Sequence, residues 1–419
     1  MATSRIVELA TRIAANTTRL DEYIKAHKLP TPSLDINGPK DTLVPKDETD
    51  LETARVAIID DTLELRRLVL GPREYLMSYT HDELISQQAI TRFRIAHSFP
   101  VGKTASFSEI AGATGLNETH IRQIIRHAIV KDIFAEPKPG VIAHNAVSRL
   151  LAEDQVIHDW VQSSTDELWQ AAAQTCNALE RFPDSQEANE TGFSLANQTD
   201  EAVYQVFSRF PERAQRFGNA MRSFTEGTGF ELSHVVDNFP WGDLGTGTVV
   251  DVGGSQGFAS MEIARKYPSL SFVVQDLEPV IAGIQVPDDL TGRVKFMAHD
   301  FFTEQTVHGD AYFFRWILHN WSDKYCIQIL RNLIPTLKPG AKIILNDNVL
   351  PKPGAISKWQ EDRLRSMDLT MTELQNAHER ELQDWKELFE LADPRFQFLW
   401  GKQPAGANLW LIVAEWNGE

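Results

Sequence analysis

The sequence predicts an α/β protein in which a helical region precedes a doubly wound, mostly parallel sheet with an antiparallel hairpin at its C-terminal edge. Two observations predict this fold class. From about Thr248 onward, apolar strand-like runs alternate with helical stretches, which is the pattern of a parallel sheet with crossover helices. The last two runs, RFQFLW and NLWLIVAEW, leave no room for a helix between them, so we expect them to pair antiparallel.

Length and composition limit the domain organisation and the partners. The 419 residues are too many for one compact core. We place an N-terminal helix and proline-rich linker at 1–50, a helical domain at 51–205 and the sheet domain at 206–419. The net charge of −17 repels phosphate backbones and anionic lipids, so we expect neither a nucleic-acid nor a membrane partner. Two distant cysteines, Cys176 and Cys326, exclude a disulfide framework and favour a reducing, cytoplasmic location.

The N-terminal segment has the pattern of an amphipathic helix. Its apolar residues fall on one face at helical spacing: Ile6, Leu9, Ile13, Leu20 and Ile24. This face is too small to be stable alone, so the helix must pack on another element. After the proline-rich stretch, a second helix is predicted from about Leu51 to Leu70, where Gly71 and Pro72 end it.

A helix, a turn, a second helix and a β-like run follow around residues 106–144. Ser106 and Glu109 form a capping box, Gly115 turns the chain, and Asn117 can cap the second helix. This order is typical of a winged helix, which is either a DNA reader or a scaffold and dimerisation module. The overall negative charge favours the second interpretation. In the first, the residues that face phosphates would be Arg122, Arg126 and Lys131.

A glycine-rich turn, DVGGSQG, follows the first strand of the sheet region. Glycines allow the backbone to turn sharply and to approach a ligand closely. The spacing of Gly253, Gly254 and Gly257 does not fit the Gly-x-Gly-x-x-Gly pattern of dinucleotide sites. Asp251 would also repel a pyrophosphate, whereas it suits a ligand with an ammonium and a sulfonium group. The turn therefore favours S-adenosylmethionine over NAD.

Two further carboxylates follow the next two strands. Asp276 ends the second strand, where an acidic side chain can accept both hydroxyls of a ribose. Asp300 ends the third strand beside Phe301 and Phe302, where an adenine can be hydrogen-bonded and stacked. Together with the glycine turn, they predict an adenosine-containing cofactor at this edge of the sheet.

These motifs resemble the class I S-adenosylmethionine-dependent O-methyltransferases, most closely the fungal branch of the caffeic-acid and sterigmatocystin-methyltransferase type. The resemblance covers most of the chain, through VVDVGGSQG, FVVQDLEPVI, HDFF, FRWILHNWSD, LKPGAKIILND and NAHERE. It implies a Rossmann-like methyltransferase sheet and an N-terminal winged-helix domain that forms a homodimer. It also implies that Asp276 binds ribose, that Asp300 and Phe301 bind adenine, and that Arg315 holds the cofactor. Ser255 replaces the usual middle glycine.

The resemblance implies that His319, in a Trp-x-x-His motif, is the general base. A phenol has a pKa of about 10 and a histidine one of about 6.5, so His319 needs a carboxylate to stabilise its imidazolium. Asp347, where the family usually has Glu, and Glu379 are both candidates, and the sequence leaves open which one contacts His319. A histidine with two carboxylates can also hold iron, but these positions have roles in a metal-free family.

The acceptor side allows more than one interpretation. Asn320 replaces the family's usual Asp, which indicates a changed acceptor or a loss of methyl transfer. Some fungal relatives bind S-adenosylmethionine but catalyse pericyclic reactions, and because those tend to replace the base, His319 favours methylation. A regulator with a vestigial catalytic domain is a further alternative. Phe217, Met221 and Met371 match family positions in the acceptor pocket, although core packing explains them equally well. An apolar, aromatic-lined pocket suits a phenolic or polyketide-type acceptor.

Overall fold

The computed structural model describes residues 3–46, 48–225 and 227–418, which form two compact units. The first unit comprises Met1–Gln170, Tyr204–Thr225 and Ile356–Glu361, and the second comprises Ala171–Val203, Glu226–Ala355 and Asp362–Glu419. The linear division into 1–50, 51–205 and 206–419 stays a prediction. Across the described ranges, no helix is both long enough and apolar enough to cross a lipid bilayer.

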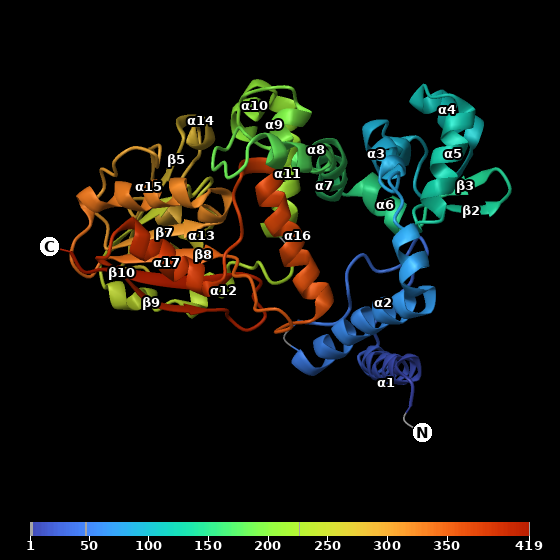
Figure 1. The fold of residues 1–419 in the computed structure, drawn as a ribbon, viewed down its shortest axis with the longest axis horizontal. Helices are drawn as coiled ribbons and strands as arrows, with labels where there is room; N and C mark the ends of the chain where they lie inside the picture. Colours follow the sequence, from blue (N-terminus) through green and yellow to red (C-terminus); the bar gives the residue numbers. More distant parts are fainter. Residues whose placement is uncertain (1–2, 47, 226, 419) are drawn as a thin grey trace. The chain divides into compact units, whose positions relative to one another are not determined.

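In the first unit, the N-terminal helix α1 (Arg5–Ala26) lies beside α2 (Thr49–Met77) (Figure 1). Leu9 of α1 is fully buried. Arg12 donates through Nε to Asp61 of α2 at 2.9 Å. Helix α2 therefore covers part of the apolar face of α1, with ion pairs beside it, while Ile6 on that face stays exposed. The helical backbone of α2 is interrupted at Gly71, whose φ is 70°, and then continues to Met77.

Local capping explains the short helices that follow in this unit. The Ser106 hydroxyl accepts from the Glu109 N–H at 3.2 Å, and the Glu109 carboxylate accepts from the Ser106 N–H at 2.7 Å. Asn117 caps the next helix by accepting from the Thr119 N–H at 2.8 Å. Three strands form a small antiparallel sheet in the order β1-β3-β2. The remaining elements are α3 (Ile85–Arg92), η1 (Ile95–His97), β1 (Thr104–Ser106), α4 (Phe107–Thr114), α5 (Glu118–Ile129), β2 (Ala135–Lys138), β3 (Val141–Ala143), α6 (Ala146–Glu153), α7 (Gln155–Ser163), η2 (Ser164–Leu168), α10 (Val203–Arg209) and α11 (Pro211–Thr225).

The second unit is built on a seven-stranded sheet with the order β6-β5-β4-β7-β8-β10-β9. The first five strands in this order are parallel, while β10 pairs antiparallel with both β8 and β9. The predicted α/β class, with a mostly parallel sheet and an antiparallel C-terminal hairpin at its edge, is confirmed. The strands are β4 (Thr248–Val252), β5 (Ser271–Asp276), β6 (Val294–Ala298), β7 (Ala311–Arg315), β8 (Lys342–Asp347), β9 (Phe396–Lys402) and β10 (Trp410–Trp416).

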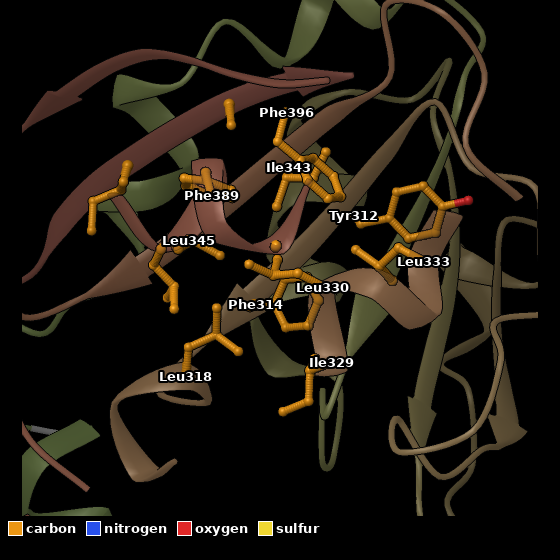
Figure 2. Packing of buried hydrophobic residues seen from close by; sticks show 14 of the residues in the cluster. Tyr312, Phe314, Leu318, Ile329, Leu330, Leu333, Ile343, Leu345, Phe389 and Phe396 are labelled. Atoms are coloured by element: carbon orange, nitrogen blue, oxygen red, sulfur yellow. The ribbon is translucent and has the colours of Figure 1, made fainter. Parts of the chain in front are cut away.

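Helices cover both faces of this sheet. Side chains alternate between the faces along each strand, and both faces carry apolar side chains that the helices bury. The helical elements are α8 (Trp169–Arg181), α9 (Gly192–Ala196), α12 (Ser233–Asn238), η3 (Trp241–Leu244), α13 (Phe258–Lys266), α14 (Glu278–Ile281), η4 (Asp288–Leu290), η5 (Leu318–Asn320), α15 (Asp323–Leu333), η6 (Ile334–Thr336), α16 (Lys358–Gln375) and α17 (Leu382–Ala392). On one face, α15 and α17 pack on Tyr312 and Phe314 of β7 and on Ile343 and Leu345 of β8 (Figure 2). On the other face, α12 and α13 pack on residues such as Phe313.

The core extends to the carboxyl end of β7, where the chain leaves the sheet. Leu318, two residues beyond Trp316, is fully buried in the cluster formed with α15 (Figure 2). The short helix η5, which carries His319, is thus held by the core on one side. Side chains at this end of the sheet are consequently presented from a rigid support, as the doubly wound architecture requires for a ligand site.

Candidate active site

The glycine positions of the turn between β4 and α13 have no space for a side chain. The N–H groups of Gly253 and Gly254 donate to the Gln275 carbonyl of β5 at 2.9 and 3.0 Å. Gly253 has φ of 73°, and a Cβ there would lie 2.6 Å from the Ile317 side chain. A Cβ on Gly254 would lie 2.5 Å from Cγ of Asp251. These glycines let the backbone itself form the wall of a ligand site.

One polar residue lies beneath this turn and another lies within it. Asp251 is buried beneath the turn, where its carboxylate accepts from the Ser260 hydroxyl at 2.6 Å. Burial raises the pKa of Asp251 to about 6, despite the Ser260 hydrogen bond that lowers it. Ser255 has φ of 50°, a left-handed conformation that glycine adopts at lower cost. The replacement of glycine noted in the sequence therefore falls on a backbone that prefers glycine.

Asp276 lies at the end of β5 next to the glycine turn. One carboxylate oxygen accepts from the Ser255 N–H at 2.9 Å, and the other accepts from the Leu277 N–H at 2.8 Å. Each oxygen keeps a further lone pair, so the carboxylate can accept a pair of vicinal hydroxyls. Burial raises the pKa of Asp276 above its ordinary value, against these two hydrogen bonds, which lower it.

An aromatic cluster follows β6 beside Asp300. The ring centroid of Trp321 lies 5.9 Å from that of Phe301 and 4.7 Å from that of Phe302. Asp300 is exposed, and its carboxylate accepts from the Phe302 N–H at 2.9 Å. A flat, polar-edged ring such as adenine can stack on aromatic faces and donate to this carboxylate. The glycine turn, the Asp276 carboxylate and this cluster fit S-adenosylmethionine.

Arg315, at the end of β7, makes its hydrogen bonds within the protein. Its guanidinium donates to the Asn346 side chain and, at 2.9 Å, to the Phe230 carbonyl. Burial lowers its pKa to about 10, and the charges of Asp251 and Asp347 act in the opposite direction. Arg315 is thus a half-buried cation between the glycine turn and the end of β8.

His319 and Glu379 form a direct hydrogen bond. His319 Nδ1 lies 3.0 Å from Glu379 Oε1, and both residues are buried. The Asn348 side chain donates to the same Glu379 oxygen at 3.0 Å. Glu379 Oε2 has no hydrogen-bond partner among the described residues. The carboxylate fixes the imidazole with Nδ1 toward itself, which leaves Nε2 available for another group.

Asp347 contacts the main chain of the same turn. Its carboxylate accepts from the His319 N–H at 3.4 Å, and it is completely buried. Burial raises the pKa of Asp347 to about 6, while the charge of His319 lowers it. Burial alone would lower the pKa of His319, but Asp347 and Glu379 together raise it above its ordinary value. The question left open by the sequence has an answer: Glu379 contacts the imidazole and Asp347 the backbone.

Both the nitrogen and the oxygen of the Asn320 side-chain amide make hydrogen bonds within the protein. Its amide donates to the Trp316 carbonyl at 2.9 Å and accepts from Gln375 of α16 at 3.1 Å. Met371 precedes Gln375 by one helical turn, so both lie on the same face of α16. This face is the one that reaches the turn carrying His319. Met371 is itself buried.

Phe217 and Met221 belong to α11 of the first unit. Within that unit the Phe217 ring packs against Phe207, with centroids 4.9 Å apart. Their assignment to an acceptor pocket stays a prediction.

Sequence reasoning missed two residues of the site. Trp321, in the aromatic cluster, is part of the FRWILHNWSD motif, so its position beside the histidine was the available signal. Arg380 follows Glu379 directly and is completely buried. In the sequence, Arg380 belongs to the charged run HERE. Such a run is usually exposed to solvent, so it gives no sign that Arg380 is buried.

The fold and these residues together define an S-adenosylmethionine-dependent methyltransferase. Residues 189–393 match the O-methyltransferase domain family. Similarity to curated proteins extends over the whole chain: it is 42% identical to O-methyltransferase pyvH of Aspergillus violaceofuscus, covering 100% of both chains. It is 38% identical to a chlorophenol O-methyltransferase of Trichoderma longibrachiatum, covering 99% of this chain and 91% of that protein. The chain belongs to this family of fungal O-methyltransferases and is an S-adenosylmethionine-dependent O-methyltransferase.

Solved structures show the same fold. The crystal structure of OxaC in complex with SAH and oxaline matches with a TM-score of 0.78 at 21% identity, covering 98% of this chain and 99% of that one. LepI in complex with SAM matches with a TM-score of 0.74 at 22% identity, covering 97% and 100%. At these identities the likeness concerns the architecture, in which a helical N-terminal region accompanies the methyltransferase sheet.

Proposed function

We propose that this enzyme methylates a hydroxyl group of a phenolic or polyketide-type secondary metabolite, with His319 as the general base. The hydrogen bond between His319 and Glu379 carries the proposal, because it orients the imidazole and leaves Nε2 free to take the hydroxyl proton. The name of the chlorophenol-methylating relative supports a phenolic acceptor. The proposed acceptor contacts are Asn320 and Met371 of the second unit and Phe217 and Met221 of the first unit.

The residues of the glycine turn are proposed to bind the methyl donor. Asp276 would hold the ribose, Asp300 and Phe301 the adenine, and the backbone of the glycine turn the remaining part, with Asp251 beneath it and Arg315 at its side. When bound, S-adenosylmethionine supplies an activated methyl group on a positively charged sulfur. The protein then has to position the acceptor oxygen and remove its proton.

The carboxylate of Glu379 supports this proton transfer. A proton arriving at Nε2 makes the ring a cation, which the negative charge of Glu379 at Nδ1 and that of Asp347 near the backbone stabilise. Because these charges raise the pKa of His319, they also bring it closer to that of a phenol.

Product analysis tests the proposal directly. The purified enzyme is incubated with S-adenosylmethionine and a panel of chlorinated phenols and hydroxylated polyketide aromatics, and the products are weighed by mass spectrometry. We expect equal amounts of S-adenosylhomocysteine and of a product heavier by one methyl group. A product of unchanged mass formed without S-adenosylhomocysteine would instead identify a pericyclic reaction and overturn the proposal.

Substitutions of the two carboxylates are expected to differ in effect. Glu379→Gln removes the charge at Nδ1 and lowers kcat by roughly 10- to 100-fold. Asp347→Asn acts through a longer contact on the backbone and lowers kcat by less than about 10-fold. Both variants lose a negative charge that raises the pKa of His319, so the acidic limb of the kcat profile moves to lower pH. Equal losses in the two variants would contradict the assignment of Glu379 as the partner of the imidazole.

We also infer that two copies of this chain associate through the first unit. Helix α2 leaves large apolar side chains exposed near its C-terminal end, with Val69 and Met77 each 72% exposed. Water-exposed apolar groups of this size are stabilised by burial against a second copy. Light scattering on the purified protein is expected to give a dimer mass, and a monomer at all concentrations would contradict the inference.

A cytoplasmic location is our final proposal about the whole chain. Cys176 is exposed and Cys326 is buried, and both are free thiols, as expected in a reducing compartment. Fractionation of cells that express the enzyme is expected to recover it in the cytosol, and recovery in the secreted fraction would contradict the proposal.

A further inference from the structure

Arg380 is a buried cation that no step of the proposed reaction uses. It lies in the loop between α16 and α17, directly after Glu379, and its side chain is completely buried. Removing a guanidinium from water costs several kcal/mol unless its donors are paired. The arrangement of its hydrogen bonds therefore shows what the buried charge is held for.

The guanidinium donates to the main chain on both sides of His319. Its Nη1 donates to the Leu318 carbonyl at 3.2 Å, and its Nη2 donates to the Trp321 carbonyl at 2.9 Å. Asp323, at the start of α15, accepts from Nε at 3.0 Å and from Nη2 at 2.6 Å. The planar fork of an arginine, with five N–H donors, can hold this set of acceptors at once, whereas a lysine cannot.

Neighbouring side chains fix the guanidinium in this place. The ring of Trp385 from α17 lies 5.0 Å below it, within the range of a cation–π interaction. The Cys326 thiol also contacts the two carbonyl oxygens, at 3.1 Å from that of Leu318 and 3.3 Å from that of Trp321. The acceptors, the counter-ion and the ring come from η5, α15 and α17, so Arg380 joins three elements at the turn that carries the base.

We propose that Arg380 is a positioning residue that fixes the main chain of residues 318–321, so that the dipeptide Glu379–Arg380 holds both the imidazole and the backbone of His319. This inference rests on the proposed role of His319 in proton transfer. Glu379 sets the orientation of the ring, and Arg380 sets the position from which the ring extends. A displacement of about 1 Å in a catalytic group can cost about 100-fold in rate, so this backbone has to be held firmly.

The charge of Arg380 also gives the proposal a distinct pH signature. The charged groups around His319 are Asp347 of β8 and Glu379 and Arg380 of the loop; the two carboxylates raise the pKa of His319 and Arg380 lowers it. Removing the guanidinium is therefore expected to move the acidic limb of the kcat profile to higher pH. This shift is opposite in sign to the one expected for Glu379→Gln.

The test compares Arg380→Met and Arg380→Lys in the full-length enzyme. Arg380→Met is expected to lower kcat by about 100-fold with KM changed by less than about 2-fold, and Arg380→Lys is expected to recover part of the loss. In Arg380→Met, hydrogen exchange of the amides at 318–321 is expected to be about 10-fold faster than in the wild type. The affinity of this variant for S-adenosylmethionine is expected to be unchanged.

Arg331→Met is the matched control. Arg331 also donates to two main-chain carbonyls, those of Ala392 at 2.7 Å and Leu391 at 3.0 Å, but at the end of α17. The Arg331→Met substitution is expected to leave kcat and the pH profile of kcat unchanged. A folded Arg380→Met variant with wild-type exchange at 318–321 would overturn the proposal. If exchange is faster in Arg380→Met but the wild-type enzyme transfers no methyl group, the role of Arg380 in fixing residues 318–321 is kept and the proposed function is overturned.

Discussion

Replacing His319 by glutamine is expected to lower kcat by about 10²- to 10⁴-fold, the usual contribution of a general base. Glutamine is similar in length and can still donate to Glu379, so the turn keeps its support while the basic nitrogen is lost. The affinity for S-adenosylmethionine should change by less than about 2-fold, because the glycine turn and Asp276 remain intact. Single-turnover kinetics and calorimetric titration of the cofactor measure the two effects separately.

The pH profile of the wild type completes this prediction. His319 accepts a proton only in its neutral form, so kcat should rise as the pH rises through its pKa. Asp347 and Glu379 raise that pKa, which places the acidic limb above the value of about 6.5 for an unperturbed histidine. The His319→Gln variant should have no such limb.

A second histidine provides the control for His319→Gln. His308 lies outside the site, where its Nδ1 is 3.0 Å from the Thr336 carbonyl. His308→Gln is expected to retain full activity and the wild-type pH profile. Wild-type turnover in His319→Gln would show that the acceptor loses its proton without this base.

The sheet could be predicted from the sequence because its signals are local. Each apolar run from TVVDVG to NLWLIVAEW alternates with a helix or a short turn, and a strand is defined within five to seven residues. The glycine turn was predictable for the same reason, since Gly253, Gly254 and Gly257 belong to one segment. Asp276 follows from this register, because the carboxyl ends of neighbouring parallel strands meet at one edge.

The family resemblance named both candidate partners of His319, but no local signal could decide which one contacts the imidazole. Asp347 and Glu379 lie 28 and 60 residues away in the sequence, and either carboxylate reaches the site. Their different contacts depend on the loop after α16, whose path no local pattern specifies. Arg380 was missed for a related reason: a charged residue next to another charge is usually exposed, and only the fold shows that its acceptors are backbone carbonyls.

The cofactor turn gives the second large expected effect. Replacing Gly254 by alanine is expected to weaken S-adenosylmethionine binding by roughly 5- to 150-fold, which corresponds to about 1–3 kcal/mol of overpacking. The new Cβ would lie 2.5 Å from Cγ and 2.6 Å from Oδ2 of Asp251, and 2.7 Å from Cγ1 of Val274. All three atoms are buried and supported by the sheet, so the turn itself has to move.

This movement falls on the surface that we propose for cofactor binding. The Gly254 N–H donates to the Gln275 carbonyl, and the next residue, Ser255, donates to Asp276. A displaced turn therefore loses its alignment with Asp276, the proposed ribose carboxylate. To bind the cofactor, the turn has to return to the original geometry, in which the new Cβ is too close to Asp251 and Val274. Because the strain is local, the thermal unfolding temperature should change less than the cofactor affinity does, as calorimetric titration and scanning calorimetry can measure.

Ser255→Gly is the matched control, one residue further along the same turn. It retains the backbone N–H that reaches Asp276 and relieves the left-handed conformation of a serine with φ of 50°. The cofactor should therefore bind with equal or higher affinity, since a non-glycine residue costs about 1 kcal/mol in this conformation. Weaker cofactor binding in Gly254→Ala together with equal or tighter binding in Ser255→Gly would show that Gly254 is needed for space. It would also show that the turn does not lose affinity on every substitution. Unchanged binding in Gly254→Ala would mean that the turn does not form the cofactor surface.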